Sequence, residues 1–503
     1  MFKTLLVANR GEIALRIVRA CRELGVRSAA VYSEADRLAP HVLEADEAHL
    51  IGPAPSAESY LSIERLLGAA RAARADAVHP GYGFLSERAV FASAVRDAGL
   101  VFVGPSPETI AAMGNKTEAR QRMRRAGVPV VPGTLEPVAD SQAGLEAARE
   151  IGYPVVLKAS AGGGGKGMRV ARDEAELMRG FDAASREAAG AFGDRSLYVE
   201  RYLERPRHVE IQVLGDGEGN VVHLGERDCS IQRRHQKLVE EAPAPELGAE
   251  AREAMGAAAV KAARAVDYLG AGTIEFLYEE GAFHFLEMNT RIQVEHPVTE
   301  LVTGVDLVQW QIRVAAGEPL SFGQEDVRIS GHAIECRITS EDPARGFLPS
   351  TGRVECLRVP SGPGIRWDGG ILEGSTVGLH YDPLLAKLVV HAPTRAEAIR
   401  RMARALSELI VIGVATSAPF HRSVMDEEDF RAGRVSIRYL EEHPALAVSS
   451  ADPELVEAVA VAAALLAEEG RQRRTPTPAA APTGTGRAFS AWRAAGWPWT
   501  RRA

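Results

Sequence analysis

The sequence lacks the features that mark secreted, membrane-spanning and nucleic-acid-binding proteins. Its 503 residues include only four cysteines, with no CxxC pair among them, which argues against a disulfide framework and favours a reducing, cytoplasmic compartment. The apolar run at the N-terminus is too short for a signal peptide, and the run at 456–466 is too short to cross a bilayer. The net charge of -8 gives no sign of a nucleic-acid partner.

Two common nucleotide-binding motifs are also missing. From Leu5 to about residue 114, β-rich runs alternate with helical ones, as in a parallel α/β layer. The loop from Asn9 to Glu12 lacks GxGxxG, so we reject a dinucleotide site there. Neither Ser nor Thr follows Lys166 after the glycine run 162–165, so this segment is not a Walker A motif. Because apolar runs flank it, we interpret it as a hairpin tip whose backbone N–H groups can face phosphate; a flexible linker is the alternative.

The stretch 285–296 is the most informative part of the chain, because polar and apolar residues alternate through it. In an extended strand its polar residues would share one face, and apolar residues such as Leu286 and Val294 would anchor the other. The polar residues are Glu287, Asn289, Arg291, Gln293 and Glu295. An ordinary half-buried strand would show the same alternation. However, this order of carboxylate, amide and guanidinium groups can hold a hard cation, orient an anion and remove a proton.

The run 287–297, Glu-Met-Asn-Thr-Arg-Ile-Gln-Val-Glu-His-Pro, resembles the signature of biotin carboxylases, which belong to the ATP-grasp ligases. The resemblance extends from Leu5 to about residue 445. It implies an α/β and α+β fold. Residues 1–114 would form a Rossmann-like N-terminal domain, and residues 115–328 an ATP-grasp domain with a mobile glycine-rich lid at about 131–203. Residues 329–445 would form a C-terminal antiparallel-sheet domain, and residues 446–503 a final helix, linker and Arg/Trp-rich tail.

The resemblance also implies an ATP site. Lys116 and Lys158 would meet the phosphates, and His208 the sugar. Glu200 and Leu203 would contact the adenine. The complete predicted set is Lys116, Lys158, Gly163, Gly164, Gly165, Glu200, Leu203, His208, Gln232, His235, Glu275 and Glu287.

A metal site is predicted beside the ATP phosphates. Glu275 and Glu287 lie in two β-patterned runs joined by a short turn, so a hairpin would place the carboxylates side by side, with Asn289 one step further on the same face. Mg²⁺ prefers such oxygen ligands, and Mn²⁺ is the alternative.

Bicarbonate and biotin sites follow from the same resemblance. Arg291, Gln293, the backbone of Val294 and Lys237 would bind bicarbonate, and Glu295 would remove its proton. The catalytic set is Glu295, Arg291, Arg337 and Lys237. Arg337 would stabilise the biotin enolate, and Tyr82 and Asp382 would line the biotin side.

No Met-Lys dipeptide occurs, so the biotinyl-lysine motif is absent and biotin is expected on a separate carrier protein. We therefore expect the biotin carboxylase subunit of acetyl-CoA carboxylase, in fatty acid biosynthesis, with a biotin carboxyl carrier protein and carboxyltransferase subunits as partners and a homodimer as its oligomeric state. The same half-reaction in a propionyl-CoA, other acyl-CoA or pyruvate carboxylase is one alternative. Another bicarbonate-using ATP-grasp ligase, such as a carbamoyl-phosphate synthetase half, and an inactive ATP-binding scaffold are the others.

The last segment is expected to differ from the rest. An alanine-rich helix precedes a Thr/Pro/Ala linker, and three of the five tryptophans, Trp492, Trp497 and Trp499, lie near the end. Large aromatic residues are frequent interface anchors, so we interpret this end as a docking segment; a frayed terminus is the alternative.

Overall fold

The computed structural model describes residues 1–134, 136–159, 168–192, 195–447, 461–462 and 464–465. Residues 1–449 form one compact unit, and the fold given below is that of this unit. The predicted glycine tip and almost all of the predicted helix, linker and tail lie outside the described residues. Within the described ranges, no helix combines the length and the hydropathy that crossing a bilayer would require.

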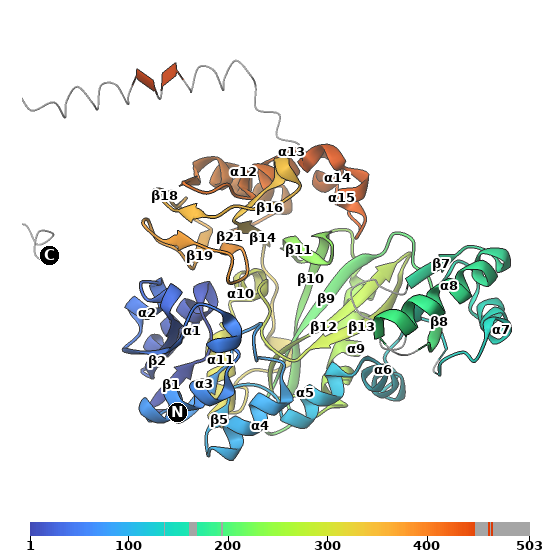
Figure 1. Ribbon diagram of the computed structural model, residues 1–503, viewed down its shortest axis with the longest axis horizontal. Coiled ribbons are helices and arrows are strands. Elements are labelled where there is room, and N and C mark those ends of the chain that lie inside the picture. The colour runs from blue at the N-terminus through green and yellow to red at the C-terminus, as the bar shows by residue number, and fades with distance from the viewer. Residues whose placement is uncertain (135, 160–167, 193–194, 448–460, 463, 466–503) are drawn as a thin grey trace, which may run out of the picture. The chain divides into compact units, whose positions relative to one another are not determined.

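A parallel five-stranded sheet forms the first layer, as the Rossmann-like prediction requires (Figure 1). Its spatial order is β3 (Glu47–Gly52), β2 (Arg27–Ser33), β1 (Thr4–Val7), β4 (Ala77–His79) and β5 (Val101–Phe102). Helices α1 (Gly11–Glu23), α3 (Ile63–Ala72) and α4 (Ala89–Asp97) bury their apolar faces in the cores of this layer. The loop between β1 and α1 lies at the carboxyl edge of the sheet, where parallel α/β sheets place their ligands.

A smaller three-stranded sheet has a core of its own. Strand β6 (Val155–Ala159) pairs antiparallel with β7 (Met168–Ala171) and β8 (Leu197–Arg201). Helices α7 (Ser141–Ile151) and α8 (Glu174–Phe192) cover it, with residues such as Leu157 and Leu177 fully buried. The pairing of β6 with β7 confirms the predicted hairpin that flanks the glycine run.

The largest sheet has eight antiparallel strands and runs through the predicted boundary at 328/329. Its spatial order is β13 (Ala282–Asn289), β12 (Gly270–Glu279), β9 (Arg207–Gly215), β10 (Val221–Arg233), β11 (Gln236–Ala242), β14 (His332–Thr339), β21 (Leu384–Ala392) and β19 (Ile365–Gly369). The link is the β11–β14 pair, in which Val239 is opposite Cys336. The second and third predicted domains therefore share one sheet.

The two faces of β11, β14 and β21 differ in character. Helix α12 (Arg395–Glu408) covers one face through an apolar core that includes Ile334, Cys336 and Met402. Helix α10 (His296–Thr303) packs on the other face through a small apolar cluster, in which Val298 and Val302 meet Ala333 and Val389. Because side chains alternate along a strand, Glu335 and Arg337 of β14 share this second face with Ala333.

The predicted strand through Glu295 is too long. Strand β13 ends at Asn289, and a loop leads from there into α10. The ladder stops because the N–H of Thr290 donates to the carboxylate of Glu87, 3.2 Å away, instead of to a neighbouring strand. Leu286 is also 41% exposed rather than buried, since a bulge in the β12–β13 pairing interrupts the alternation. The polar residues of 285–296 are thus gathered by a strand end and a loop.

Candidate active site

One large cleft contains nearly all of the predicted site residues. Its volume is about 1310 Å³, above the roughly 300–1000 Å³ of a typical small-molecule pocket, so it has room for more than one substrate. The predicted residues that line it are Tyr82, Lys116, Lys158, Glu200, His208, Gln232, His235, Lys237, Glu275, Glu287, Asn289, Arg291, Gln293, Val294, Glu295, Arg337 and Asp382. Leu203 is not among the described lining residues, and Gly163, Gly164 and Gly165 lie outside the described ranges.

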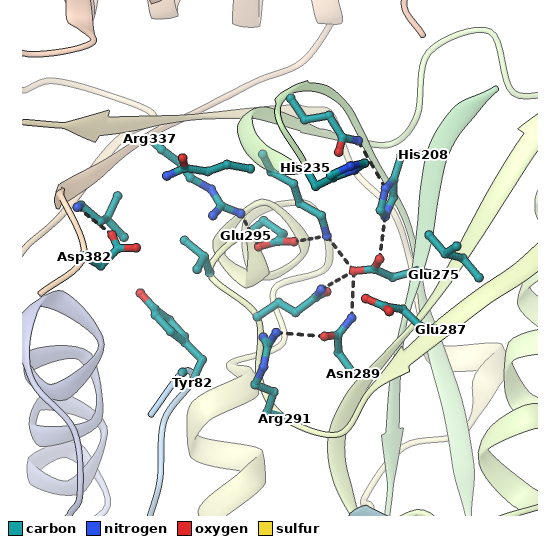
Figure 2. A pocket seen from close by; sticks show the side chains of 18 of the residues that line it. Tyr82, His208, His235, Glu275, Glu287, Asn289, Arg291, Glu295, Arg337 and Asp382 are labelled. Carbon is teal, nitrogen blue, oxygen red and sulfur yellow. Dashed lines mark hydrogen bonds and ion pairs between the residues drawn. The ribbon is translucent and has the colours of Figure 1, made fainter. Parts of the chain in front are cut away.

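Glu275 and Glu287 are directly opposite each other across the β12–β13 hairpin, as predicted. Asn289 donates from Nδ2 to Oε1 of Glu275, 2.8 Å away (Figure 2). Burial and the charge of Glu275 raise the pKa of Glu287. Among the described residues, Glu287 has no hydrogen-bond or ion-pair partner of its own. Two adjacent carboxylates, one of them unmatched, form a donor set that fits a hard divalent cation.

Glu275 is the centre of a dense polar network. Lys237 Nζ lies 2.8 Å from its Oε1, Gln293 Nε2 lies 2.7 Å from the same oxygen, and His208 Nε2 lies 2.9 Å from Oε2 (Figure 2). Burial alone would raise the pKa of Glu275, but the charges of Lys237 and His208 outweigh it and hold the pKa well below its ordinary value. Burial would likewise lower the pKa of His208, yet Glu275 raises it.

Glu295 lies between two cations at the start of α10. Lys237 Nζ is 2.7 Å from its Oε1, and Arg337 Nη2 is 2.8 Å from its Oε2. Burial would raise the pKa of Glu295, but Lys237, Arg337 and Arg227 together lower it. A carboxylate held in this way is a weak base. It becomes a stronger base when an anion draws Lys237 away from it.

The predicted bicarbonate residues are fixed by neighbours on different elements. Arg291 donates from Nε to Glu87 Oε2 at 2.8 Å and from Nη2 to Asn289 Oδ1 at 2.9 Å. The carbonyl of Val294 accepts from Nζ of the fully buried Lys387 at 3.0 Å. The Arg291 guanidinium and the Gln293 amide line the same cleft as Glu295, and such groups are suited to a small planar anion.

The predicted nucleotide end of the cleft has a salt bridge of its own. Glu200 on β8 accepts from Arg120 and, at 2.6 Å, from Lys158 Nζ on β6. Burial would raise the pKa of Glu200, but these two cations lower it. The Lys158 ammonium has three N–H donors, so donors remain beyond the one that it gives to Glu200. Lys116, the first residue of α6 (Lys116–Arg125), lines the same cleft.

A tight turn between β10 and β11 positions His235 and Lys237 in the cleft. Strand β10 ends at Arg233 and β11 begins at Gln236, and the two residues between them, Arg234 and His235, have φ of +49° and +68°. Positive φ at both positions is the geometry of a type I′ hairpin turn. Gln232 approaches His208, with 3.5 Å between Gln232 Nε2 and His208 Nδ1.

The predicted biotin residues lie across the cleft from Glu275 (Figure 2). Tyr82 donates its hydroxyl to Oε1 of Glu12, and Nζ of Lys387 is 3.1 Å from Oε2 of the same residue. Asp382 accepts from the backbone N–H of Leu384 at 2.8 Å, so it also shapes the loop that enters β21.

Several residues of the network could not be identified from the sequence. Arg227 is fully buried and donates to Glu210 at 2.6 Å and to Gln293 at 2.9 Å. Glu210 also accepts from Lys237 at 2.6 Å. The only signal in the sequence is the presence of charged residues inside β-rich runs, and nothing local reveals their partners. The other unpredicted groups of the site are Glu12, Glu87, Arg120, Glu240 and Lys387.

Three family models match consecutive parts of the chain. "Biotin carboxylase, N-terminal domain" covers residues 1–110, "Carbamoyl-phosphate synthase L chain, ATP binding domain" covers 115–322, and "Biotin carboxylase C-terminal domain" covers 335–442. The central match alone would also fit the carbamoyl-phosphate synthetase alternative. The two flanking matches distinguish between the two families.

Individual proteins are similar over nearly their whole length. A biotin carboxylase from Haemophilus influenzae is 55% identical over 88% of this chain and 98% of its own, and a pyruvate carboxylase subunit of Methanothermobacter thermautotrophicus is 54% identical over 88% and 90%. Among solved structures, the biotin carboxylase domain dimer of the Hydrogenobacter thermophilus 2-oxoglutarate carboxylase, in complex with MgADP, ADP and bicarbonate, has a TM-score of 0.82. It is 51% identical and covers 90% of this chain and 99% of that one.

Proposed function

The chain belongs to the biotin carboxylase family, and we propose on that basis that it carboxylates biotin with ATP and bicarbonate, through carboxyphosphate. The observation that carries this proposal is the position of Glu295. It lies between Lys237 and Arg337, next to the Glu275–Glu287 pair, in a cleft large enough for a nucleotide, a small anion and biotin.

The first step uses the anion-orienting residues. Arg291, Gln293 and the backbone of Val294 hold bicarbonate with one oxygen toward the γ-phosphate of ATP. Lys237 leaves Glu295 and binds bicarbonate and the γ-phosphate. The loss of this cation raises the basicity of Glu295, so that Glu295 can take the bicarbonate proton. The freed oxygen forms a bond to the γ-phosphorus while the bond to the leaving ADP breaks, giving carboxyphosphate.

The second step takes place on biotin. Carboxyphosphate splits into carbon dioxide and phosphate, the phosphate takes the N1′ proton of biotin, and the resulting enolate attacks carbon dioxide. Glu295 is neutral at this point because it holds the bicarbonate proton, so Arg337 can leave it and stabilise the enolate oxygen. Tyr82 and Asp382 line the biotin side of the cleft.

The nucleotide is placed by residues of β6, β8 and α6. Lys116 and Lys158 bind the phosphates together with the glycine run 163–165, while Glu200 and Leu203 contact the adenine. Glu275, Glu287 and Asn289 would hold Mg²⁺ or Mn²⁺, which neutralises phosphate charge when it is bound. We assign the lid to about 131–203, and the separate core between β6–β8 and helices α7 and α8 supports this assignment.

We further propose that the chain works as a homodimeric subunit of acetyl-CoA carboxylase and receives biotin on a separate carrier protein. A dimer of a similar biotin carboxylase domain supports the oligomeric state. The similar proteins from pyruvate and 2-oxoglutarate carboxylases favour a keto acid as the second candidate acceptor. The acceptor is selected by carboxyltransferase subunits, so it is tested by supplying each carboxyltransferase with carboxylated carrier protein.

The half-reaction is tested by measuring phosphate release from MgATP with bicarbonate and biotin each present or omitted, together with carboxybiotin. The expected result is bicarbonate-dependent release that biotin stimulates, with carboxybiotin formed. ATP binding without turnover, even with biotinylated carrier protein, would instead indicate an inactive scaffold.

A further inference from the structure

A second pair of glutamates lies behind Arg337, outside the cleft. Glu240 of β11 and Glu335 of β14 are directly opposite each other in the antiparallel ladder, and both are fully buried. Directly opposed side chains in such a ladder have Cβ atoms about 5 Å apart. Within the described part of the chain, Oε2 of Glu240 and both carboxyl oxygens of Glu335 have no hydrogen-bond partner.

The local charges do not balance around this pair. Glu240 Oε1 accepts from Arg337 Nε at 2.6 Å, and the same guanidinium donates from Nη2 to Glu295 at 2.8 Å. Arg337 thus contacts both Glu240 and Glu295, and Glu335 has no cation of its own among the described residues. The nearby cation on β21, Lys387, is bound to Glu12 and to the carbonyl of Val294. The titratable groups that act on the pair are Cys229 of β10, Lys237 of β11, Cys336 and Arg337 of β14, Lys387 of β21, and Glu295 before α10.

A buried carboxylate without a counter-charge is strongly disfavoured, so one member of the pair carries a proton. Burial and the charge of Glu240 raise the pKa of Glu335 well above its ordinary value, whereas Arg337 partly offsets the effect of burial on Glu240 and leaves its pKa at about 7. Glu335 is thus the neutral member. Glu240 is the member whose charge changes near neutral pH.

Resting on the proposed function, we infer that Glu240 is a positioning residue for the biotin step, which holds Arg337 by Nε while Nη2 moves from Glu295 to the enolate oxygen. Glu335 supports this role as a neutral acid, because a second charge beside Glu240 would compete for the same guanidinium. Neither Glu240 nor Glu335 is among the described residues that line the cleft. The ATP step does not require Arg337 to move, so it depends on Glu240 less than the biotin step does.

A pH dependence follows from this role. Glu240 is an anion above about pH 7 and takes a proton below it, so its hold on Arg337 weakens as the pH falls through 7. The pKa of Glu295 is lowered, so Glu295 stays ionised over the same range. Carboxybiotin formed per ATP cleaved is therefore expected to fall on the acidic side of pH 7, while bicarbonate-dependent ATP cleavage changes less.

The test uses the full chain and two readouts across pH, namely bicarbonate-dependent ATP cleavage without biotin and carboxybiotin formation with free biotin. In Glu240→Gln, carboxybiotin formation is expected to fall about tenfold at pH 8, the scale of a lost charged hydrogen bond. KM for ATP is expected to stay the same. The amount of carboxybiotin formed per ATP cleaved is expected no longer to fall near pH 7.

A matched control is available at Glu226. It is also buried and accepts from Arg252 Nε at 2.7 Å, and its Oε2 likewise has no partner among the residues described. Glu226→Gln is expected to lower stability to a similar degree without changing the amount of carboxybiotin formed per ATP cleaved, because the cation that Glu226 holds is Arg252 and not Arg337. In Glu335→Gln the new amide has the same shape as the neutral acid. The pH at which carboxybiotin formed per ATP cleaved falls, which is the acidic limb of the pH profile, is therefore expected to stay the same.

The possible failures are distinguishable. A wild-type chain that forms no carboxybiotin would remove the proposed function, and this inference with it. Wild-type carboxybiotin formation together with an unchanged ratio and pH profile in Glu240→Gln would overturn the inference alone. A shift of the acidic limb to lower pH in Glu335→Gln would show that Glu335 is charged, which would overturn its assignment as the neutral acid.

Discussion

Glu240 and Glu241 are neighbours on β11, but they point to opposite faces of the sheet and have opposite pKa shifts. On the α12 side, Arg395 binds both oxygens of Glu241, at 2.7 and 3.0 Å, and His332 lies 2.7 Å from Oε2. Burial would raise the pKa of Glu241, but Arg395 and His332 lower it to about 2. On the α10 side, Glu240 shares Arg337 with Glu295, and burial raises its pKa to about 7.

The difference shows how one sheet separates stability from chemistry. On the α12 face, which carries an apolar core, Arg395 pairs with Glu241 and lowers its pKa, so Glu241 stays ionised over a wide pH range. On the α10 face, Glu240 and Glu295 share Arg337, and Glu335 has no hydrogen-bond partner among the described residues, so protons and cations can be redistributed when an anion enters. Substitutions on the first face should therefore change folding, and those on the second should change turnover.

The largest effect is expected for Glu295→Gln on the α10 side. Removing the base should lower bicarbonate-dependent ATP cleavage by about 10³-fold, because the amide cannot accept the proton. Nucleotide binding, measured by titration with ATP, should be retained. Normal turnover in this variant would contradict the role of Glu295 as base.

Arg337→Ala is expected to separate the two steps. Carboxybiotin formation should fall by about 10²-fold, since the enolate loses its stabilising charge, and ATP cleavage without biotin should fall less. Both rates are measured on the same preparation. Equal losses in the two rates would argue against the assignment of Arg337 to the biotin oxygen.

On the α12 side, Met402→Ala should change folding alone. Met402 is fully buried against β14 and β21, so its truncation is expected to lower the free energy of unfolding by about 3 kcal/mol, as measured by urea denaturation. The rate per folded molecule should not change. The control is Met178→Ala on α8, where the side chain is 43% exposed and the expected loss is below about 0.5 kcal/mol.

The smallest effect is expected for Glu241→Gln, and it depends on pH. The lowered pKa means that ionised Glu241 stabilises the fold above its unfolded value of 4.5, and that this stabilisation is lost as the pH falls toward 2. The variant should be less stable by about 2 kcal/mol at pH 7, and the difference should shrink in acid. Unfolding curves at several pH values measure this change, and a constant difference would contradict the ion-pair explanation.

Part of the fold and of the candidate site could be predicted because the signals are local. Alternating β-rich and helical runs indicated the parallel layer, and two β-runs joined by a short turn predicted that Glu275 is opposite Glu287. The alternation of polar and apolar residues through 285–296 predicted too long a strand. Periodicity does not reveal that the Thr290 N–H donates to Glu87, more than 200 positions earlier, and the strand ends at Asn289. It also could not predict that Glu200 is already bound by Lys158 and Arg120.

The sequence by itself determined which kinds of groups this protein can use, namely the glycine run, the lysines and the polar series from Glu287 to Glu295, since motifs and periodicity depend on neighbours along the chain. Only the tertiary structure decided how those groups are charged and held. Arg227, Glu210 and Gln293 meet from three separate segments, and Glu240 meets Arg337 across nearly a hundred residues. The reason is that electrostatic interactions depend on distance and burial, and both are set by the strand pairing of the whole sheet.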